Sequence, residues 1–243
     1  MNPLELDDYQ HIVFFTGAGL SAEAGIPTYR GAGGIWAKYD YGAYACQRAF
    51  DSDPSKVWDF HDERRRRMAS AEPATAHRMI AAAQAAHSSV AIVTQNIDGL
   101  HQRAGACHVI ELHGSIWRVR CRCPGAPQVN LEAPIAERLC PTCGVWRRPD
   151  IVWFEDPLQP EPIQQAIQAI AACDLLISIG TSGVVYPAAE LPRAAAQRGA
   201  RCIEINPEPT AVSDWYDTHL RTGAGDALRT LLPHLTTGGT TPG

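Results

Sequence analysis

Two pairs of cysteines lie close together in the sequence and could bind a metal. Cys121 and Cys123 form the first pair, and Cys140 and Cys143, in CPTCG, form the second, with Cys140 following Cys123 by 17 positions. Four thiolates in two close pairs favour a structural zinc ion, with free thiols and a redox pair as the rival interpretations. The one-residue spacer of the first pair gives a tighter bite than C-x-x-C. Weaker metal binding and displacement of one ligand therefore stay open as alternatives.

The other cysteines are Cys46, Cys107, Cys173 and Cys202, which lie in apolar or helical surroundings. We expect them to be small core residues. With no recognisable secretion signal, the eight cysteines indicate thiols and metal ligands rather than a disulfide framework.

A glycine-rich loop follows the apolar run HIVFFTG. In GAGLSAEAG, Gly17, Gly19 and Ala22 match the G-x-G-x-x-G/A pattern, whose glycines let backbone amides approach a pyrophosphate at a helix N-terminus. A tight strand-to-helix turn explains the pattern about equally well. A dehydrogenase would carry an acidic residue at the end of a second strand, about 20 residues further on. That region here is PTYRGAGGIW, which argues against an ordinary dehydrogenase.

Polar residues follow three further apolar runs. TQNIDGLH comes after VAIV, GTS (Gly180 to Ser182) after LLISI, and NPE (Asn206 to Glu208) after CIEI. In open α/β sheets, ligands bind at the carboxyl ends of the strands. Several strand ends converging on one crevice favour a nucleotide site over a simple turn.

Four consecutive arginines occupy the segment VWDFHDERRRRM. Arg65, Arg66 and Arg67 each have Asp62 or Glu63 three or four residues before them, the order that stabilises a helix by about 0.2 to 0.5 kcal/mol per pair. We expect these three arginines to form a solvated, self-paired face.

Arg64 differs from the other three because it has no acidic neighbour at helical spacing. Val57, Phe60, His61, Arg64 and Met68 fall on one stripe that is otherwise apolar. His61 and Arg64 should therefore face inward. An inward arginine needs a carboxylate, either a structural one or a ligand's.

These residues must be positioned by an alternation of strands and helices. This alternation predicts an α/β fold with a doubly wound parallel sheet. The helix that carries the arginines should begin with Asp53 as N-cap and Pro54 at its first position. Buried strands are expected in HIVFFTG, VAIVTQN, DLLISIG and RCIEIN, and helices over Thr75 to Ala86, Glu161 to Cys173, Pro187 to Arg198 and Gly225 to Leu235.

Two stretches interrupt this alternation and predict a second, smaller domain. We assign residues 30–73 and 118–149 to a small helical and zinc-binding domain made from two insertions. Residues 1–29, 74–117 and 150–236 form the nucleotide-binding domain. Residues 237–243, in TTGGTTPG, have no apolar content to bury and are expected to be a disordered tail.

Composition bounds the possible partners. The chain has 243 residues, 45% of them hydrophobic, and a net charge of −5, which fits a globular protein and gives no electrostatic footprint for nucleic acid. No apolar run approaches the about 18 residues that a membrane span needs, and the acidic start MNPLELDD is unlike a signal peptide. We expect a cytoplasmic monomer without nucleic-acid or membrane partners.

Six motifs in order, GAGLSAEAGIPTYR, TQNIDGLH, ELHGS, RPDIVWFED, GTS and VVYPAA, resemble the sirtuin family of NAD-dependent protein deacylases, from about residue 11 to 235. The resemblance implies a Rossmann-like domain that binds NAD as co-substrate and a small domain that binds structural zinc through Cys121, Cys123, Cys140 and Cys143. The family pattern is C-x-x-C twice, so the C-x-C pair departs from it.

The resemblance also implies the reaction and its partners. The acyl oxygen of an acylated lysine in a protein or peptide attacks C1′ of the nicotinamide ribose. Nicotinamide leaves, an alkylimidate forms, and the products are lysine and O-acyl-ADP-ribose. His113, in ELHG, is the expected base for a ribose hydroxyl, since imidazole titrates near neutral pH. His113 and Asn96 are the expected catalytic residues, and His101 is expected to be structural.

The resemblance assigns the NAD site residue by residue. Asp98 works with Ala18 and Ile97 at the nicotinamide pocket, while Gln95 and Asn96 orient the ribose. Arg30 and Trp36 belong to a loop expected to order over bound NAD. The expected cofactor-binding residues are Gly17, Ala18, Gly19, Ala22, Glu23, Pro27, Thr28, Tyr29, Arg30, Trp36, Gln95, Asn96, Ile97, Asp98, Gly180, Thr181, Ser182, Asn206, Pro207, Glu208 and Ala224.

The substrate peptide is expected to add as a strand between VWFE and Gly183 to Tyr186. The predicted contacts include Val152, Trp153, Phe154 and Val184. Sirtuins that remove succinyl and malonyl groups carry Tyr-x-x-Arg on the helix that here contains His61 and Arg64. Here Arg64 matches the arginine and His61 stands in place of the tyrosine. We expect these two residues to bind the acyl group, and we favour a preference for acidic acyl groups slightly over plain deacetylation.

Two other classes of function stay open at this point. One is NAD glycohydrolase or ADP-ribosyl transfer on the same scaffold, against which the VWFE strand argues. The other is a non-catalytic NAD-sensing module, against which the presence of His113, Asn96 and Asp98 argues.

Overall fold

A six-stranded sheet forms the centre of the larger part of the molecule. The computed structural model describes residues 3–30 and 33–235, so the predicted disordered tail at 237–243 lies outside the described residues. The strand order is β3-β2-β1-β7-β8-β9 and every pair is parallel. The strands are β1 (Ile12–Thr16), β2 (Val90–Thr94), β3 (Val109–Glu111), β7 (Leu175–Ile179), β8 (Arg201–Ile205) and β9 (Thr218–Leu220).

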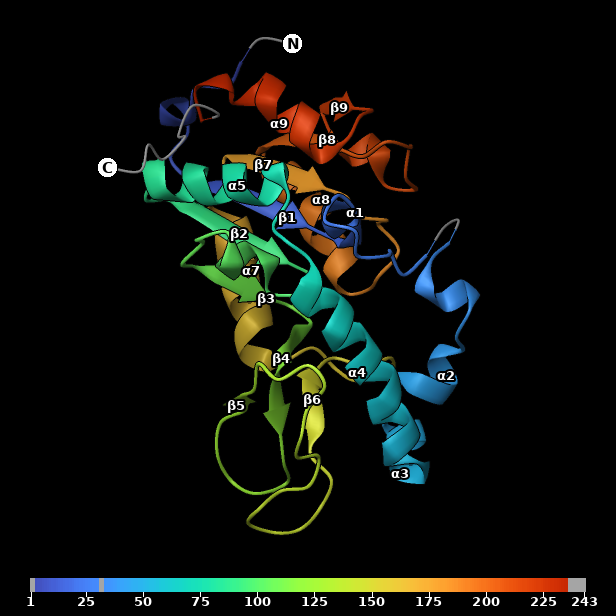
Figure 1. Cartoon of the computed structure of the whole chain (residues 1–243). Helices are drawn as coiled ribbons and strands as arrows, with labels where there is room; N and C mark the ends of the chain where they lie inside the picture. The colour runs from blue at the N-terminus through green and yellow to red at the C-terminus, as the bar shows by residue number, and fades with distance from the viewer. Residues whose placement is uncertain (1–2, 31–32, 236–243) are drawn as a thin grey trace, which may run out of the picture.

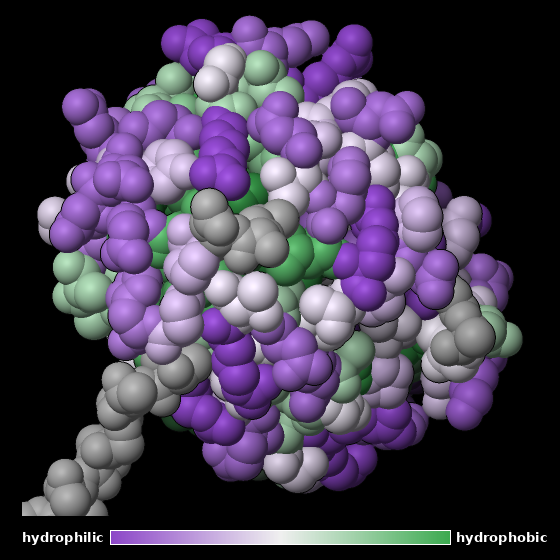
Figure 2. Space-filling view, turned by 90° about the horizontal axis from the view of Figure 1, so that it is seen from above, coloured by the Kyte–Doolittle hydropathy of each residue, from purple (hydrophilic) through white to green (hydrophobic). Residues whose placement is uncertain are grey.

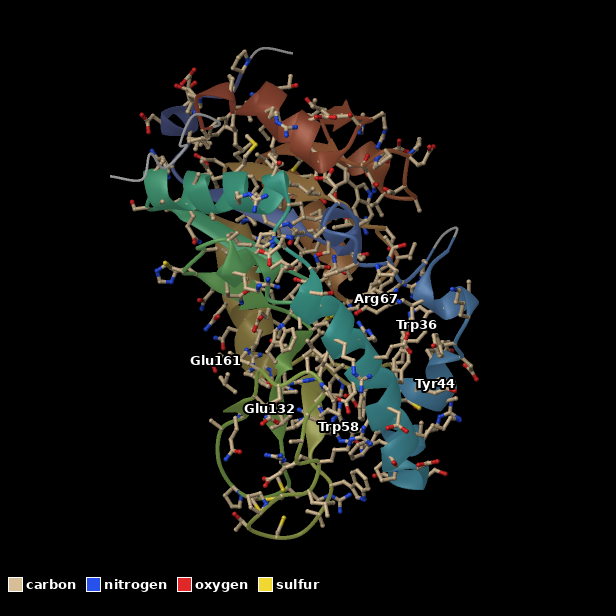
Figure 3. All side chains as sticks on the ribbon, viewed as in Figure 1. Trp36, Tyr44, Trp58, Arg67, Glu132 and Glu161 are labelled. Atoms are coloured by element: carbon tan, nitrogen blue, oxygen red, sulfur yellow. The ribbon has the colours of Figure 1, made fainter. Side chains whose placement is uncertain are left out.

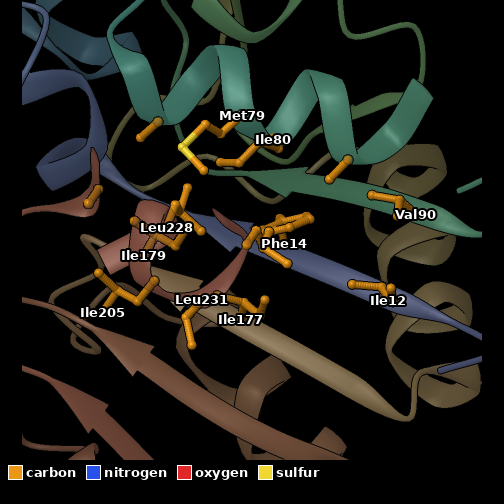
Figure 4. Packing of buried hydrophobic residues seen from close by; sticks show 14 of the residues in the cluster. Ile12, Phe14, Met79, Ile80, Val90, Ile177, Ile179, Ile205, Leu228 and Leu231 are labelled. Carbon is orange, nitrogen blue, oxygen red and sulfur yellow. The ribbon is translucent and has the colours of Figure 1, made fainter. Parts of the chain in front are cut away.

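Helices cover both faces of this sheet, which confirms the doubly wound prediction. Ile12 and Phe14 of β1 belong to the core beneath α5 (Thr75–Ala86) and α9 (Ala224–Leu231), as Figure 4 shows. Val13 and Phe15, which point to the other face, belong to the core with α7 (Pro160–Ala172) and α8 (Leu191–Gln197). Because both faces are covered, β1 and β7 are buried along their whole length, which explains their uninterrupted apolar runs.

A smaller assembly lies at one end of the molecule, away from the six-stranded sheet (Figure 1). Its antiparallel sheet has the order β5-β4-β6, from β4 (Gly114–Arg120), β5 (Gln128–Val129) and β6 (Arg148–Ile151). The helix α4 (Pro54–Ser70) packs here, and its Trp58 donates an indole N–H to the carbonyl oxygen of Arg147 at 2.7 Å. Trp58 of the first predicted insertion and Ile135 of the second belong to one hydrophobic core, while the domain boundaries stay a prediction.

Short helices complete the chain between these layers. They are α1 (Ala18–Ala22), α2 (Tyr41–Tyr44), α3 (Gln47–Ser52) and α6 (Leu100–Arg103), with 3₁₀ turns at Leu6–Asp8, Ile35–Ala37, Ala188–Glu190, Ser213–Trp215 and Pro233–Leu235.

The helix α4 begins as predicted from the sequence, but one of its arginines is not exposed as predicted. Asp53 caps the helix by accepting the Lys56 amide at 3.0 Å, and Pro54 is the first helical residue. The prediction that Arg65 belongs to a solvated face is wrong, since Arg65 has no exposed surface. Its guanidinium donates to the carbonyl oxygens of residues 116, 130 and 132.

The acidic neighbours of the arginine run are also divided between surface and interior. Asp62 is buried and pairs with Arg138 at 2.6 Å, rather than with a neighbour on its own helix. Arg67 and Glu63 are exposed and lie 3.8 Å apart, as predicted, and Arg66 is exposed. The expectation that Cys107 is a core residue is wrong as well, because Cys107 is exposed.

The surface is largely hydrophilic where Figure 2 shows it, with hydrophobic residues confined to small separate areas. Within the part of the chain that the structure describes, no helix is both long and apolar enough to cross a membrane.

Candidate active site

A cavity of about 830 Å³ opens at the carboxyl ends of the parallel strands. Its lining comes from the loops after β1, β2, β7 and β8 and from the small assembly. The chain leaves β1 for strands on one side and later returns to β7 on the other, so the cavity lies where the strand order reverses. The predicted cofactor residues that line it are Gly17, Ala18, Gly19, Ala22, Thr28, Tyr29, Arg30, Trp36, Gln95, Asn96, Ile97, Gly180, Thr181, Ser182, Asn206, Pro207 and Glu208.

The glycines after β1 allow α1 to pack closely on the loop after β7. A Cβ atom on Gly17 would lie 2.8 Å from the carbonyl oxygen of Gly180, and one on Gly19 would lie 2.7 Å from its Cα. Gly180 itself has φ +64°. The Gly19 amide donates to the Gly180 carbonyl at 2.9 Å. Close packing therefore requires these glycines, and a ligand site can share them.

A buried chain of polar groups links the loops after β1 and β2. Asn96 donates through Nδ2 to the Gly17 carbonyl at 2.9 Å and to the Ser21 hydroxyl at 3.0 Å. Ser21 donates to Asp98 at 2.7 Å, and the other carboxylate oxygen of Asp98 accepts the Leu100 amide at 2.9 Å. Burial raises the pKa of Asp98, although these two donors oppose the shift. These hydrogen bonds hold Asn96 at the cavity wall.

His113 lies on the cavity wall with one ring nitrogen engaged. Its Nδ1 is 2.9 Å from the carbonyl oxygen of Gln95. Since a carbonyl only accepts, this contact assigns the proton to Nδ1 and leaves the Nε2 lone pair free. Burial lowers the pKa of His113 below its ordinary 6.5, against the opposing effect of the Gln95 carbonyl. His113 is therefore a neutral base at pH 7.

His101, in contrast, lies outside the cavity lining. It is buried, its Nε2 is 3.0 Å from the Thr16 hydroxyl, and its ring packs edge-on against His77 at 5.1 Å between centroids. Burial lowers the pKa of His101 to about 3. These contacts agree with the structural role expected from the sequence.

His61 and Arg64 face inward as the apolar stripe of α4 predicts, and both line the cavity. His61 has no exposed surface, and its Nε2 accepts the indole N–H of Trp153 at 3.1 Å. Arg64 donates to the hydroxyl of Tyr29, with its guanidinium 5.0 Å from the Tyr29 ring and 5.6 Å from the Phe60 ring.

An aromatic wall stands beside this pair. Trp36, labelled in Figure 3, stacks on Phe60 of α4 at 6.1 Å and contacts Phe154 edge-on at 5.5 Å. Val152 and Trp153 also line the cavity, and the exposed side chain of Val184 stands at its edge. The predicted substrate residues are thus brought together around one opening.

The four predicted metal ligands meet at one point. Their sulfur atoms all lie within 4.8 Å of one another. Neighbouring sulfurs are 3.7 Å (Cys121 to Cys123), 3.3 Å (Cys121 to Cys143) and 3.9 Å (Cys123 to Cys140) apart. Tetrahedral zinc with Zn–S bonds of about 2.3 Å needs sulfurs about 3.8 Å apart. The set fits a zinc ion, and the one-residue spacer does not prevent it.

The comparison with protein families decides the identity of this arrangement. The model described as Sir2 family matches residues 17–187. The chain belongs to the Sir2 family. This confirms the resemblance drawn from the six motifs.

Members of the Sir2 family match nearly the whole chain. The NAD-dependent protein deacylase 2 of Pyrobaculum aerophilum is 45% identical over 225 residues, 92% of this chain and 90% of the relative. The NAD-dependent protein deacylase 1 of Pseudomonas aeruginosa is 42% identical over 233 residues, 92% and 93% of the two chains. A mutant Sir2 homologue in complex with ADP-ribose has a TM-score of 0.90 at 39% identity, and the match covers 95% of this chain and 93% of that structure's chain. A Sir2 structure with p53 peptide and NAD⁺ has a TM-score of 0.81 at 30% identity, covering 94% and 95%.

Four residues of the predicted cofactor set do not line the cavity: Glu23, Pro27, Asp98 and Ala224. Asp98 is held in the buried polar chain, and Glu23 accepts the Gly225 amide at 3.1 Å, which ties α1 to the first turn of α9. Their contacts with NAD stay a prediction.

Two residues near the site were missed from the sequence. Ser21 bridges Asn96 and Asp98, and only its place in the glycine loop could have pointed to it. Arg65 binds the Ile116 carbonyl, while the next residue, Trp117, donates its indole N–H to the Asp98 carbonyl at 2.6 Å. No local pattern signals these contacts, because the partners of Arg65 are more than 50 positions away.

Proposed function

We propose that this protein is an NAD-dependent protein lysine deacylase, which moves an acyl group from a lysine side chain to ADP-ribose and releases nicotinamide. One observation carries the proposal. His113, oriented by Gln95 and neutral at pH 7, lies on the same cavity as the glycine loop and Asn96. The relatives named NAD-dependent protein deacylase support it.

The residues on the cavity fit NAD. The glycines leave a concave wall, and amide and hydroxyl groups from Gln95, Asn96, Thr181 and Ser182 stand around it. When bound, NAD supplies the ADP-ribosyl group that accepts the acyl group, with nicotinamide as the leaving group. Asn96 is held in place for the ribose by Gly17 and Ser21.

The proposed base is Nε2 of His113. It accepts a proton from a hydroxyl, while the Gln95 carbonyl holds the ring and stabilises the imidazolium that results. Tyr29 and Trp36 line one side of the cavity and exclude water there. On the other side, Val152 to Phe154 and Val184 receive the peptide.

The proposed preference for certain acyl groups rests on Arg64. This arginine lines the cavity and, among the described residues, forms no contact ion pair with a carboxylate, although Asp98 acts on it at longer range. A terminal carboxylate on the acyl group would satisfy its charge. We therefore propose that succinyl and malonyl groups are preferred over acetyl.

Zinc has a structural part in this proposal. Bound by four thiolates, it would fix the loops that hold Cys121 to Cys143 and would have no open position for water. Backbone amides of residues 143 and 142 lower the pKa of Cys140, while hydrogen bonds with the Cys143 and Cys121 thiols raise the pKa of Cys123, so the four sulfurs share their protons unevenly and Cys140 is the first thiolate to form.

We further propose that the protein acts as a monomer in the cytoplasm, on acylated proteins and without nucleic-acid or membrane partners. The net charge of −5 supports the absence of a polyanionic partner. None of the eight cysteines, each in the described part of the chain, forms a disulfide, which suits a reducing compartment.

A panel of acyl-lysine peptides tests the proposal. Purified protein is given NAD and acetyl-, succinyl- or malonyl-lysine peptide of one sequence, and nicotinamide and deacylated peptide are measured together. Equal amounts of the two products are expected, with faster turnover of the acidic acyl peptides. Nicotinamide release without peptide turnover would instead identify a glycohydrolase.

A further inference from the structure

Arg64 is built to bind an anion. Only 8% of its surface is exposed, it lines the cavity, and its buried Nε has no hydrogen-bond partner in the described part of the chain. The arginines beside it on α4 are satisfied by carbonyl oxygens (Arg65) or paired with an acid (Arg67). Asp98 acts on Arg64 only at longer range, and no carboxylate of the described residues forms a contact ion pair with it, so a ligand carboxylate would be its first direct counter-ion.

Tyr29 provides a second donor next to this guanidinium. Its hydroxyl oxygen accepts an N–H from Arg64 Nη2, and its ring lies 5.0 Å from the guanidinium carbon. With the oxygen accepting from Arg64, the phenolic proton is free to be donated. Among residues 3–30 and 33–235, no acceptor takes it. One N–H group and one O–H group therefore stand side by side on the cavity wall.

His61 is not available for the same task. Its Nε2 accepts the Trp153 indole N–H at 3.1 Å, so its proton is on Nδ1. The Nδ1 atom, like Arg64 Nε, is buried without a hydrogen-bond partner among the described residues, but the whole His61 side chain has no exposed surface. The ring stacks on Trp153 at 5.8 Å between centroids, which makes it part of the wall rather than a donor to the cavity.

The surroundings favour a carboxylate on an apolar stem. Trp36 packs against Phe60 at 6.1 Å and against Phe154 at 5.5 Å between ring centroids. Trp36 and Phe154 line the cavity with Arg64, and Phe60 lies behind them, 5.6 Å from the guanidinium. Such walls suit the methylene groups of a short dicarboxylic acyl chain better than a hydrated phosphate.

We propose that Tyr29 is a specificity-determining residue, whose hydroxyl binds the terminal carboxylate of an acidic acyl group together with the Arg64 guanidinium. This inference rests on the proposed deacylase function. It moves the second donor from α4, where the sequence placed it at His61, to the segment between α1 and the turn at Ile35–Ala37.

The test compares two acyl groups of equal chain length. Values of kcat/KM at saturating NAD are measured for succinyl- and butyryl-lysine peptides of one sequence, with the wild type, Tyr29→Phe, Arg64→Met and Tyr39→Phe. Tyr39 is the matched control, because its hydroxyl bonds to Glu63 and lies outside the cavity lining. The KM for NAD is measured for each variant.

The wild type should prefer the succinyl peptide. Tyr29→Phe should lower the succinyl-to-butyryl ratio by about 10- to 100-fold, as expected for one hydrogen bond to a charged group. Arg64→Met should lower it at least as much, and Tyr39→Phe should leave it unchanged. His61→Phe, which keeps a ring against Trp153, should change the ratio by less than about threefold.

The outcomes separate the two proposals. If the wild type releases no deacylated peptide from either substrate, the proposed function fails. If both peptides are turned over and Tyr29→Phe keeps the wild-type ratio, this inference alone is overturned. A rise in the KM for NAD without a change in the ratio overturns it as well, because Tyr29 would then serve only the cofactor.

Discussion

The Nδ1 atom of His113 lies 2.9 Å from the carbonyl oxygen of Gln95, and this single contact decides which ring nitrogen can act as a base. The acceptor holds the proton on Nδ1 and leaves Nε2 free toward the cavity. Burial lowers the pKa of the ring, so the neutral form prevails at pH 7. The expected chemistry follows from this protonation state.

The pH profile of deacylation should reflect that state. Because the base must be neutral and its pKa is below 6.5, kcat/KM should stay level through neutral pH and fall only below pH 6.5. Steady-state rates between pH 5 and 8 check this. An acid limb centred above 6.5 would contradict it.

Removal of the imidazole should abolish most of the activity. His113→Ala is expected to lower kcat by about 100- to 10,000-fold, the usual contribution of a positioned base. His108→Ala, which removes an exposed histidine outside the cavity lining, is the matched control and should keep wild-type rates. Comparable rates for both variants would mean that His113 is not the base.

Adjacent arginines on α4 should differ sharply in their effect on stability. Arg65→Met leaves the buried carbonyl oxygens of residues 116, 130 and 132 without a donor, so it should lower the free energy of unfolding by about 3 kcal/mol. Arg66→Met, at an exposed position, should change it by less than about 0.5 kcal/mol. Urea denaturation of both variants measures the difference, and equal values would contradict the buried role of Arg65.

The cysteine cluster should contain stoichiometric zinc. Purified protein is expected to carry one zinc ion per chain by elemental analysis, and Cys143→Ser should lose metal and melt at a lower temperature. Cys107→Ser, at an exposed cysteine outside the cluster, should do neither. Fully folded wild-type protein without metal would refute the zinc site.

Buried histidines should make the fold sensitive to acid. Burial lowers the pKa of His77 to about 4 and that of His101 to about 3. The neutral rings stabilise the fold above their unfolded pKa of about 6.5, and this contribution is lost as pH falls toward 4 and 3, at about 1.4 kcal/mol per pH unit for each ring. Unfolding free energies at pH 7, 6 and 5 test the slope. His101→Gln should flatten it, and a slope unchanged by this variant would count against the assignment.

Four strands of the large sheet, β1, β2, β7 and β8, could be predicted from the sequence because they are mostly buried on both faces. The run VAIV lies within β2 (Val90–Thr94), and LLISI is β7 itself. The strands β3 and β9 escaped prediction, since each has three residues that are mostly half-exposed and show no clear periodicity. Short edge strands depend on tertiary pairing that the local sequence does not contain.

The candidate site was predictable as far as it depends on strand ends. The glycine loop after β1 and the polar residues after β2, β7 and β8 line one cavity, because the carboxyl ends of parallel strands lie at the same edge of the sheet. Side-chain partners were not predictable. Helical spacing predicts an acidic partner for Arg65 on its own helix, whereas its acceptors, such as the Glu132 carbonyl, belong to a distant segment. The local sequence also does not show that the Trp153 indole donates a hydrogen bond to His61.

The products of one turnover test the central claim most directly. Protein, NAD and a succinyl-lysine peptide are incubated, and the ADP-ribose products are identified by mass spectrometry. We expect O-succinyl-ADP-ribose in an amount equal to the deacylated peptide and to nicotinamide. Free succinate with unconsumed NAD would show ordinary hydrolysis and contradict the account.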